Sequence, residues 1–162
     1  MVRRGAVRRG LVRGRTRVRR SAILPLGGVG RGGSPMARTV FLSFAAEDQW
    51  LANALRAEAE HRGGGLEFRD SAVWEPFGRA RRAHVERLLR ACSATICLVG
   101  QTTWRSDAVN WEIRKSRQLG KRVVAVRLSP DVSRFPEALI KPGVTVLPRD
   151  IEQVARALGA AA

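Results

Sequence analysis

The most apolar run of the sequence is Ala94-Thr95-Ile96-Cys97-Leu98-Val99, which contains no charged residue. A short run with β-branched residues is typical of a strand that is buried on both faces, as in a parallel sheet. Helical patterns flank it at residues 79–92 and 108–119, and Gly120 stands where the second helix is expected to end. The run is therefore predicted to be the central strand of a sheet whose connections are helices.

Strand and helix patterns continue to alternate on both sides of this run. Four more strands are predicted at residues 40–44, 66–70, 123–128 and 144–147. Helices are predicted over residues 45–62 and after Asp150, which is a suitable N-cap. Their predicted inward residues are Trp50, Leu51, Ala54 and Leu55 in the first, and Ile151, Val154 and Leu158 in the second. The pattern predicts an α/β fold, a flavodoxin-like, doubly wound parallel sheet of five strands in the order 2-1-3-4-5 with helices on both faces.

The positive charge is concentrated at the N-terminal end of the chain. The whole sequence has 30 Lys and Arg against 14 Asp and Glu, a net charge of +16, and residues 1–35 hold ten Arg and no acid. Such an Arg/Gly-rich segment buries little and repels itself. We therefore expect a disordered tail over residues 1–35 and one folded domain over residues 36–162, with a net charge of +6.

Four interpretations of the tail remain open. An arm that binds RNA or DNA is disfavoured, because no aromatic side chain is interleaved for base stacking, and nucleic acid is not an expected partner. A twin-arginine export signal at Arg19-Arg20 is weakened by Pro25 in the apolar stretch that follows, and a transit peptide lacks an amphipathic period. The favoured interpretation is that Met36 is the true initiator and that the preceding residues are leader sequence from a GC-rich genome.

The sequence also disfavours a membrane-spanning protein, a disulfide-stabilised protein and a metal-binding protein. No apolar run approaches the roughly 20 residues that a membrane-spanning helix needs, so a cytoplasmic protein without a membrane partner is expected. Cys92 and Cys97 form no C-x-x-C pair, and His61 and His84 have no partner at ligand spacing. A reducing compartment and the absence of a metal site are the resulting expectations.

Ligands of doubly wound sheets bind beyond the carboxyl ends of the strands, here near the switch between strands 1 and 3. No glycine follows strand 1, which disfavours a flavin or P-loop phosphate site, and strand 3 ends without the Asp of a phosphoacceptor domain. The polar residues predicted at this edge are Ser43, Asp70, Ser71, Gln101, Thr102, Thr103 and Glu112. Glu112 is either an ordinary acid near a helix N-terminus or a side chain that overhangs the crevice.

Four motifs in this part of the chain resemble one known family. They are Val40-Phe41-Leu42-Ser43-Phe44 with Glu47-Asp48, then Phe68-Arg69-Asp70-Ser71, then residues 93–100, then Ser106-Asp107-Ala108-Val109-Asn110-Trp111-Glu112-Ile113. Together they look like the TIR-like domain of the Thoeris antiphage ThsB group, over about residues 38–130. Phe44 stands where the family usually has Tyr, and Ala108 where an aromatic residue is common. The glutamate, Glu112, is retained.

The resemblance implies an enzyme that cleaves the bond between nicotinamide and ribose in NAD. In catalytic TIR domains the glutamate matching Glu112 drives this cleavage, and an ADP-ribose product, often cyclised, serves as a signal. The substrate-binding residues that the resemblance implies are Phe41, Ser43, Phe44, Asp70, Ser71, Ser106 and Trp111. It also implies NAD as substrate with no cofactor or metal, self-association through TIR-like surfaces, and an effector protein that responds to the signal in bacterial antiphage defence.

Other functions stay open beside this one. A non-catalytic TIR-like module that acts through protein association would have the same fold, because a fold does not determine a function. Asp70 and Ser71 are equally interpretable as turn residues. Nucleic-acid binding through the tail is the least favoured function.

Overall fold

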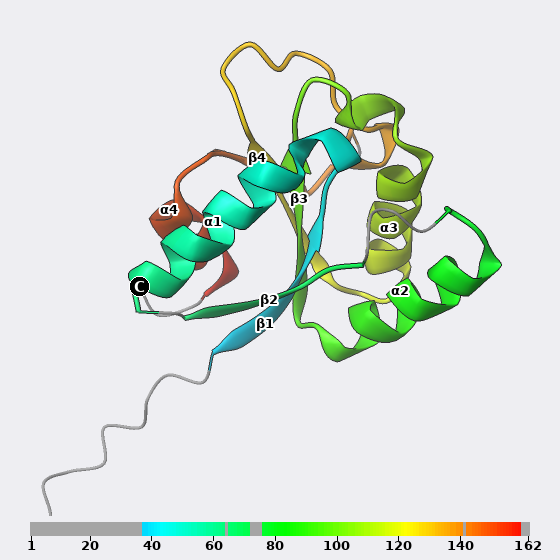
Figure 1. The fold of residues 1–162 in the computed structure, drawn as a ribbon, viewed down its shortest axis with the longest axis horizontal. Coiled ribbons are helices and arrows are strands. Elements are labelled where there is room, and N and C mark those ends of the chain that lie inside the picture. Colours follow the sequence, from blue (N-terminus) through cyan, green and yellow to red (C-terminus); the bar gives the residue numbers. More distant parts are fainter. Residues whose placement is uncertain (1–36, 64, 72–75, 141, 160–162) are drawn as a thin grey trace, which may run out of the picture. The chain divides into compact units, whose positions relative to one another are not determined.

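A five-stranded parallel sheet forms the centre of the structure, a computed structural model that describes residues 37–63, 65–71, 76–140 and 142–159 (Figure 1). Its strands are β1 (Arg38–Ser43), β2 (Leu66–Arg69), β3 (Ala94–Val99), β4 (Arg122–Arg127) and β5 (Thr145–Pro148). The strand order is β2-β1-β3-β4-β5, with every pairing parallel. The predicted topology and the central position of β3 are confirmed. The predictions about the tail and about Met36 lie outside the described residues.

Each of the first three connections between strands contains an α-helix, as predicted, whereas the described part of the connection between β4 and β5 contains only a 3-10 turn. The helices are α1 (Gln49–His61), α2 (Arg79–Ala91), α3 (Asp107–Gln118) and α4 (Ile151–Leu158), with 3-10 turns η1 (Ala46–Asp48), η2 (Thr103–Arg105) and η3 (Glu137–Leu139). Helices α1 and α4 cover one face of the sheet, and α2 and α3 cover the other (Figure 1).

The alternation of side chains along β1 connects this layering to the candidate site. Val40 and Leu42 are buried in the cluster beneath α1 and α4, whereas Phe41 is buried in the cluster with α2. Because successive side chains of a strand point to opposite faces, Ser43 shares the face of Phe41 and points toward α2 and α3. The period of the strand therefore determines which helices the Ser43 hydroxyl can reach.

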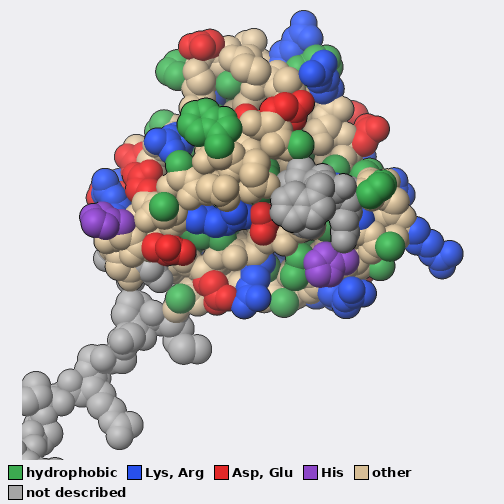
Figure 2. Space-filling model, viewed as in Figure 1, with side chains coloured by type: hydrophobic (Ala, Val, Ile, Leu, Met, Phe, Trp, Pro, Cys, Tyr) green, Lys and Arg blue, Asp and Glu red, His purple; other side chains and the backbone are tan. Residues whose placement is uncertain are grey.

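Charged side chains of both signs are interspersed on the face of the molecule that Figure 2 shows. On this face (Figure 2) the positive side chains do not form the continuous basic stripe that is typical of nucleic-acid binding. Within the described residues, no helix combines the length and the apolar character needed to cross a membrane.

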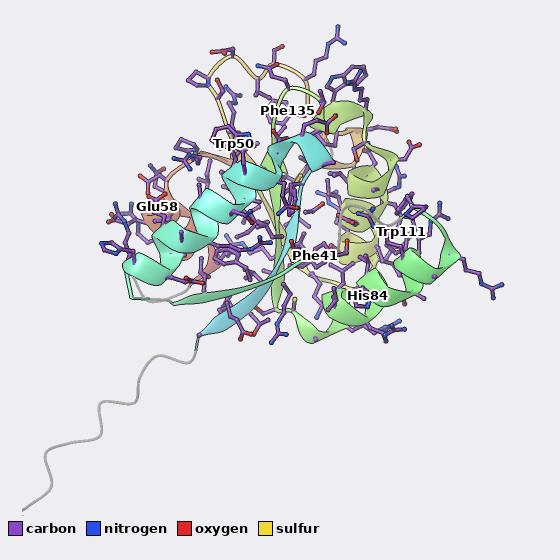
Figure 3. All side chains as sticks on the ribbon, viewed as in Figure 1. Phe41, Trp50, Glu58, His84, Trp111 and Phe135 are labelled. Carbon is purple, nitrogen blue, oxygen red and sulfur yellow. The ribbon has the colours of Figure 1, made fainter. Side chains whose placement is uncertain are left out.

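The prediction for the inward face of α1 is wrong at Trp50. This side chain is 68% exposed, and the buried residues of α1 are Ala52, Leu55 and Ala59 (Figure 3). At about 100° per residue, Trp50 lies about 140° around the helix from Leu55, whereas Ala52 and Ala59 lie within about 60° of it. The 3-10 turn η1 takes up the residues before α1, so the helix presents its small residues to the sheet.

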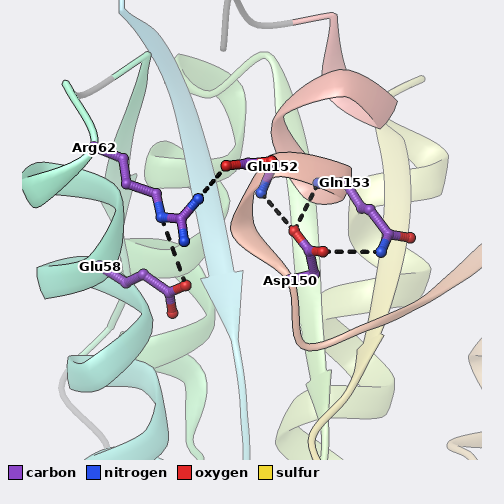
Figure 4. Close-up of polar contacts among 5 residues, drawn as sticks. All are labelled: Glu58, Arg62, Asp150, Glu152 and Gln153. Atoms are coloured by element: carbon purple, nitrogen blue, oxygen red, sulfur yellow. Dashed lines mark hydrogen bonds and ion pairs between the residues drawn. The ribbon is translucent and has the colours of Figure 1, made fainter.

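The last helix is capped and tied to α1 as Figure 4 shows. The Asp150 carboxylate accepts hydrogen bonds from the backbone N–H groups of Glu152 (2.9 Å) and Gln153 (3.1 Å), which confirms the predicted N-cap. Arg62, just after α1, forms an ion pair with Glu152 of α4. Ile151, Val154 and Leu158 are buried, as predicted.

Candidate active site

Glu112 lies in α3 and is buried beneath the carboxyl edge of the sheet, with only 3% of its surface exposed. The Ser43 hydroxyl, at the end of β1, donates a hydrogen bond of 2.6 Å to Glu112 Oε2. The helix is held at its start by Ser106, whose side chain accepts a hydrogen bond from the Val109 N–H (3.3 Å). A strand end and a capped helix thus bring together two residues that the resemblance assigned to one site.

Arg81 is the second partner of the glutamate. Its Nη2 atom lies 3.7 Å from Glu112 Oε1, and Arg81 is only 7% exposed. The guanidinium also lies 5.8 Å from the centre of the Phe77 ring, a distance typical of a cation–π contact. The buried carboxylate therefore has a hydroxyl on one oxygen and a guanidinium near the other.

The sequence analysis missed Arg81, although the sequence contains a signal for it. The buried residues of α2 are Arg81, Val85 and Leu89, at a spacing of four that places them on one helical face. A charged residue on an otherwise apolar face is seldom buried without a partner. That position in the pattern of α2 was the available indication of an interior ion pair.

Burial raises the pKa of Glu112 to about 7. The hydrogen bond from Ser43 and the positive charge of Arg81 oppose this rise, and the negative charge of Asp70 adds to it. A carboxyl group with such a pKa changes its charge near neutral pH, which is the range in which acid, base and electrostatic catalysis operate.

Two buried hydroxyl groups hold the backbone of Glu112 in place. Ser116 Oγ donates a hydrogen bond of 2.8 Å to the Glu112 carbonyl oxygen, and it lies 2.8 Å from Thr95 Oγ1 on β3. Ser116 and Thr95 are both fully buried. The helix position that carries the carboxylate is therefore fixed to the central strand.

An open pocket of about 350 Å³ lies beside these residues. It is lined by Phe44, Ala45, Ala46, Glu47, Arg81, Thr102, Arg105, Ser106 and Ala108. Most of these residues follow β1 and β3, so the pocket occupies the switch point of the sheet, where ligands of such folds bind. Ala108 precedes Glu112 by four residues on the same face of α3, and the pocket volume lies within the range of small-molecule sites.

The predicted substrate-binding residues fall into two groups. Ser43 contacts Glu112, and Phe44 and Ser106 line the pocket. Phe41 and Ser71 are buried, and neither is among the described residues that line the pocket.

Asp70 and Trp111 also have other partners. Asp70 Oδ2 accepts a hydrogen bond of 2.5 Å from Arg56, whose guanidinium lies 5.9 Å from the centre of the Phe44 ring. Trp111 is half-buried and meets Phe77 edge to face, with 5.9 Å between the ring centres. These contacts place both residues near the site. They do not test the predicted role of Asp70 and Trp111 in substrate binding.

Asp48 is a second acid at the same edge of the sheet. Its Oδ2 atom accepts a hydrogen bond of 3.2 Å from Thr103 Oγ1, which itself accepts one of 2.8 Å from the Gly100 N–H. A Cβ atom at Gly100 would come within about 2.3 Å of Asp48 Oδ2, so any side chain at this position would require the carboxylate to shift. Burial raises the pKa of Asp48, and the Thr103 hydrogen bond lowers it.

Comparisons with known proteins identify the family of the chain and its fold. The family model described as "Thoeris protein ThsB, TIR-like domain" matches residues 41–133, more than half of the chain. This segment contains Ser43, Arg81 and Glu112. Among curated proteins, no sequence gives a significant match.

Solved structures of similar fold include TIR domains. The TIR domain of the Toll-related receptor TRR-2 from Hydra magnipapillata has a TM-score of 0.51 at 14% identity, over 74% of this chain and 89% of that chain. The TIR domains of the activated Roq1 resistosome, which directly recognises the pathogen effector XopQ, have a TM-score of 0.45 at 17% identity, over 58% of this chain and 59% of that chain. The CMP N-glycosidase BcmB of Clostridium botulinum has a TM-score of 0.47 at 13% identity, over 75% of this chain and 98% of that chain. At these identities the likeness to the Hydra domain concerns the fold alone.

Proposed function

The chain belongs to the family of the TIR-like domain of Thoeris protein ThsB, and we propose that it is an NAD-cleaving enzyme whose product is a nucleotide signal in bacterial antiphage defence. NAD is the substrate, and the chain's own side chains suffice for the chemistry. We further propose that the protein self-associates through TIR-like surfaces and that an effector protein responds to the product.

The observation that carries the proposal is the position of Glu112 directly behind Arg81, a residue that lines the pocket at the switch point of the sheet; Glu112 itself is not among the lining residues. Its carboxylate is buried, held by Ser43 and close to ionisation at neutral pH. A buried carboxylate interacts with a nearby cation far more strongly than a solvated one does, because little water screens the charges.

Cleavage of NAD requires little more than such a group. The bond between the ribose C1′ atom and the nicotinamide nitrogen breaks, and its electron pair goes to the nitrogen, so nicotinamide leaves as a neutral base without a general acid. The positive charge that develops on the ribose resembles the oxocarbenium ion of glycoside hydrolysis. We assign the stabilisation of this cation to ionised Glu112, and the orientation of the carboxylate to the Ser43 hydroxyl.

The second half of the reaction decides the product. Water that attacks C1′ and loses a proton gives linear ADP-ribose, whereas attack by a nucleophilic atom of the same nucleotide gives a cyclic product. Both routes pass through the same cation and need the same carboxylate. The proposal therefore applies to either product.

Nicotinamide release from NAD is the direct test. The full chain is incubated with NAD at high protein concentration, and the products are separated by chromatography; we expect nicotinamide and an ADP-ribose product. Glu112→Gln is expected to give none, while Glu60→Gln, which changes an exposed acid on α1, is expected to retain the activity. Absence of turnover both in vitro and in phage-infected cells would contradict the proposal.

A non-catalytic signalling module is the second candidate, and one observation favours it. The Glu112 carboxylate is almost fully covered and is paired with Arg81, as expected of a structural ion pair. In that case Glu112→Gln would change stability and partner binding without any effect on NAD.

Nucleic-acid binding would depend on residues 1–35, which are outside the described part of the chain, and deletion of these residues is expected to abolish it.

A further inference from the structure

Arg81 is the charged side chain that joins the buried carboxylate to the pocket. Its guanidinium lies 3.7 Å from Glu112 on one side, and the same residue is part of the pocket lining. The distance is longer than the roughly 2.7–2.9 Å of a charge-assisted hydrogen bond, so the pair is loose. A loose ion pair at a pocket wall can exchange its partner at lower cost than a tight bidentate one.

The pocket also contains a second guanidinium. Arg105 follows β3 and lines the same pocket, together with the hydroxyl-bearing Ser106 and Thr102. Glu47 is the one acid among the described lining residues, against two arginines. Guanidinium forks and hydroxyl groups match the oxygen atoms of phosphate groups in charge and geometry.

We propose that Arg81 and Arg105 form the subsite for the diphosphate of a dinucleotide, and that Arg81 moves from Glu112 to a phosphate oxygen when the substrate binds. This inference rests on the proposed function, because it assigns a substrate group to the same pocket. It adds two binding residues that the sequence analysis did not name.

Electrostatics explain why such an exchange suits the reaction. With Arg81 beside it, the Glu112 carboxylate is already neutralised and has less charge to offer a developing cation. When Arg81 pairs with phosphate, the positively charged nicotinamide ring of NAD, and then the ribosyl cation, takes its place beside Glu112. Each buried charge keeps a partner throughout, so no step leaves an uncompensated charge in the interior.

The exchange predicts an unusual coupling between two substitutions. In Glu112→Gln, Arg81 can move to a phosphate group without breaking an ion pair with a carboxylate. The affinity of this variant for a diphosphate ligand is therefore expected to increase. In Arg81→Gln the same affinity is expected to fall by about tenfold or more, the value of a charge-assisted hydrogen bond. In the double variant the gain from Glu112→Gln is expected to disappear, since the two residues act on the same step.

Calorimetric titration of the full chain with ADP-ribose tests this subsite without any turnover. Nicotinamide riboside, which has no phosphate, serves as the ligand control. Because the loss of Arg81 removes the group that competes with its positively charged ring for Glu112, it is expected to bind Arg81→Gln at least as tightly as the parent chain. Arg87→Gln removes a charge from an exposed position of α2 and is expected to leave both affinities unchanged. Arg81→Lys is expected to retain part of the affinity for ADP-ribose.

Several outcomes would overturn the subsite. They are equal affinity of Arg81→Gln and the parent chain for ADP-ribose, loss of nicotinamide riboside binding together with ADP-ribose binding, and no binding of ADP-ribose by the parent chain. If Arg81→Gln does not fold, the exposed Arg105 gives the test instead, because Arg105→Gln is expected to weaken ADP-ribose binding alone. If ADP-ribose binding depends on Arg81 but NAD is not cleaved, the proposed function is contradicted and the subsite is supported. If NAD is cleaved but ADP-ribose binding does not depend on Arg81, the subsite is contradicted and the proposed function is supported.

Discussion

Two acids at the carboxyl edge of the sheet, Glu112 and Asp48, have similar local chemistry but different neighbours. Burial raises the pKa of both, and each accepts a hydrogen bond from a hydroxyl group, Ser43 in one case and Thr103 in the other. The Asp48 carboxylate packs closely against the backbone at Gly100. The Glu112 carboxylate instead faces Arg81, which lines a pocket. A raised pKa therefore does not by itself distinguish a reactive acid from a structural one; the two carboxylates differ in their neighbours, a pocket-lining guanidinium beside Glu112 and the Gly100 backbone beside Asp48.

The largest expected difference between the two acids is in activity. Glu112→Gln is expected to reduce nicotinamide release at least about a hundredfold, a typical loss when a group that stabilises transition-state charge is removed. Asp48→Asn is expected to keep the activity of its folded fraction within a few fold of the parent chain. The measurement is the initial rate of nicotinamide release, corrected for the folded fraction. Equal losses of activity in Glu112→Gln and Asp48→Asn would contradict the proposed difference between the two acids.

Glu112→Gln should also differ from the parent chain in how stability depends on pH. The pKa of Glu112 in the folded chain, about 7, lies above its ordinary value of 4.5, so its contribution to stability is complete below pH 4.5 and is lost as pH rises through 7. From this source the parent chain is expected to lose up to about 3 kcal/mol of unfolding free energy between pH 5 and pH 8. Glu112→Gln is expected to lack this loss in urea titrations, and a parallel pH dependence in both proteins would contradict the raised pKa.

Gly100 gives a test of the structural acid alone. Gly100→Ala is expected to destabilise the fold by about 1–3 kcal/mol, because the added Cβ overlaps the Asp48 carboxylate. In a double-mutant cycle with Asp48→Ala, much of this cost is expected to vanish. Thermal or urea unfolding of the four proteins gives the coupling energy. A coupling near zero would show that the Asp48 carboxylate is not what excludes a side chain at Gly100.

The smallest expected effect concerns the Ser43 hydroxyl. Its hydrogen bond lowers the pKa of Glu112, so Ser43→Ala is expected to raise that pKa. The rising limb of nicotinamide release against pH should then move upward by about one pH unit, the value of one hydrogen bond to a charged group. Ser93→Ala removes an exposed hydroxyl that bonds to the Thr39 carbonyl oxygen, and it is expected to leave the profile unchanged. A downward shift in Ser43→Ala would reverse the assigned role.

Much of the fold was predictable from the sequence. The strands of the sheet and the Asp150 cap follow from the spacing of apolar residues and from local capping chemistry, which act over a few residues. The order of the strands was expected from the fold class that their alternation with helices indicates. Trp50 shows the limit of that reasoning. A shift in the start of α1 by one 3-10 turn changes which side chains face the sheet, and the apolar pattern there allowed more than one inward face.

The candidate site was only partly predictable. The resemblance identified Glu112 and Ser43, and the structure brings them to 2.6 Å of each other. Arg81 was missed because its partner is 31 positions away in the chain, and nothing within α2 specifies a carboxylate. The close packing of Asp48 against Gly100 was not predicted either, because the two residues are far apart in the chain and follow two neighbouring strands, β1 and β3.

The sequence alone therefore determined the type and order of the elements, since these depend on periodicity, turn residues and caps that each lie within a short segment. It also placed the polar residues at the carboxyl ends of the strands, because parallel strands bring those ends to one edge. Only the tertiary structure decided which acid faces the guanidinium of a pocket-lining arginine and which is packed against a glycine. That decision depends on the packing of α2 and α3 against β1, where differences of an ångström separate a buried ion pair from a steric clash.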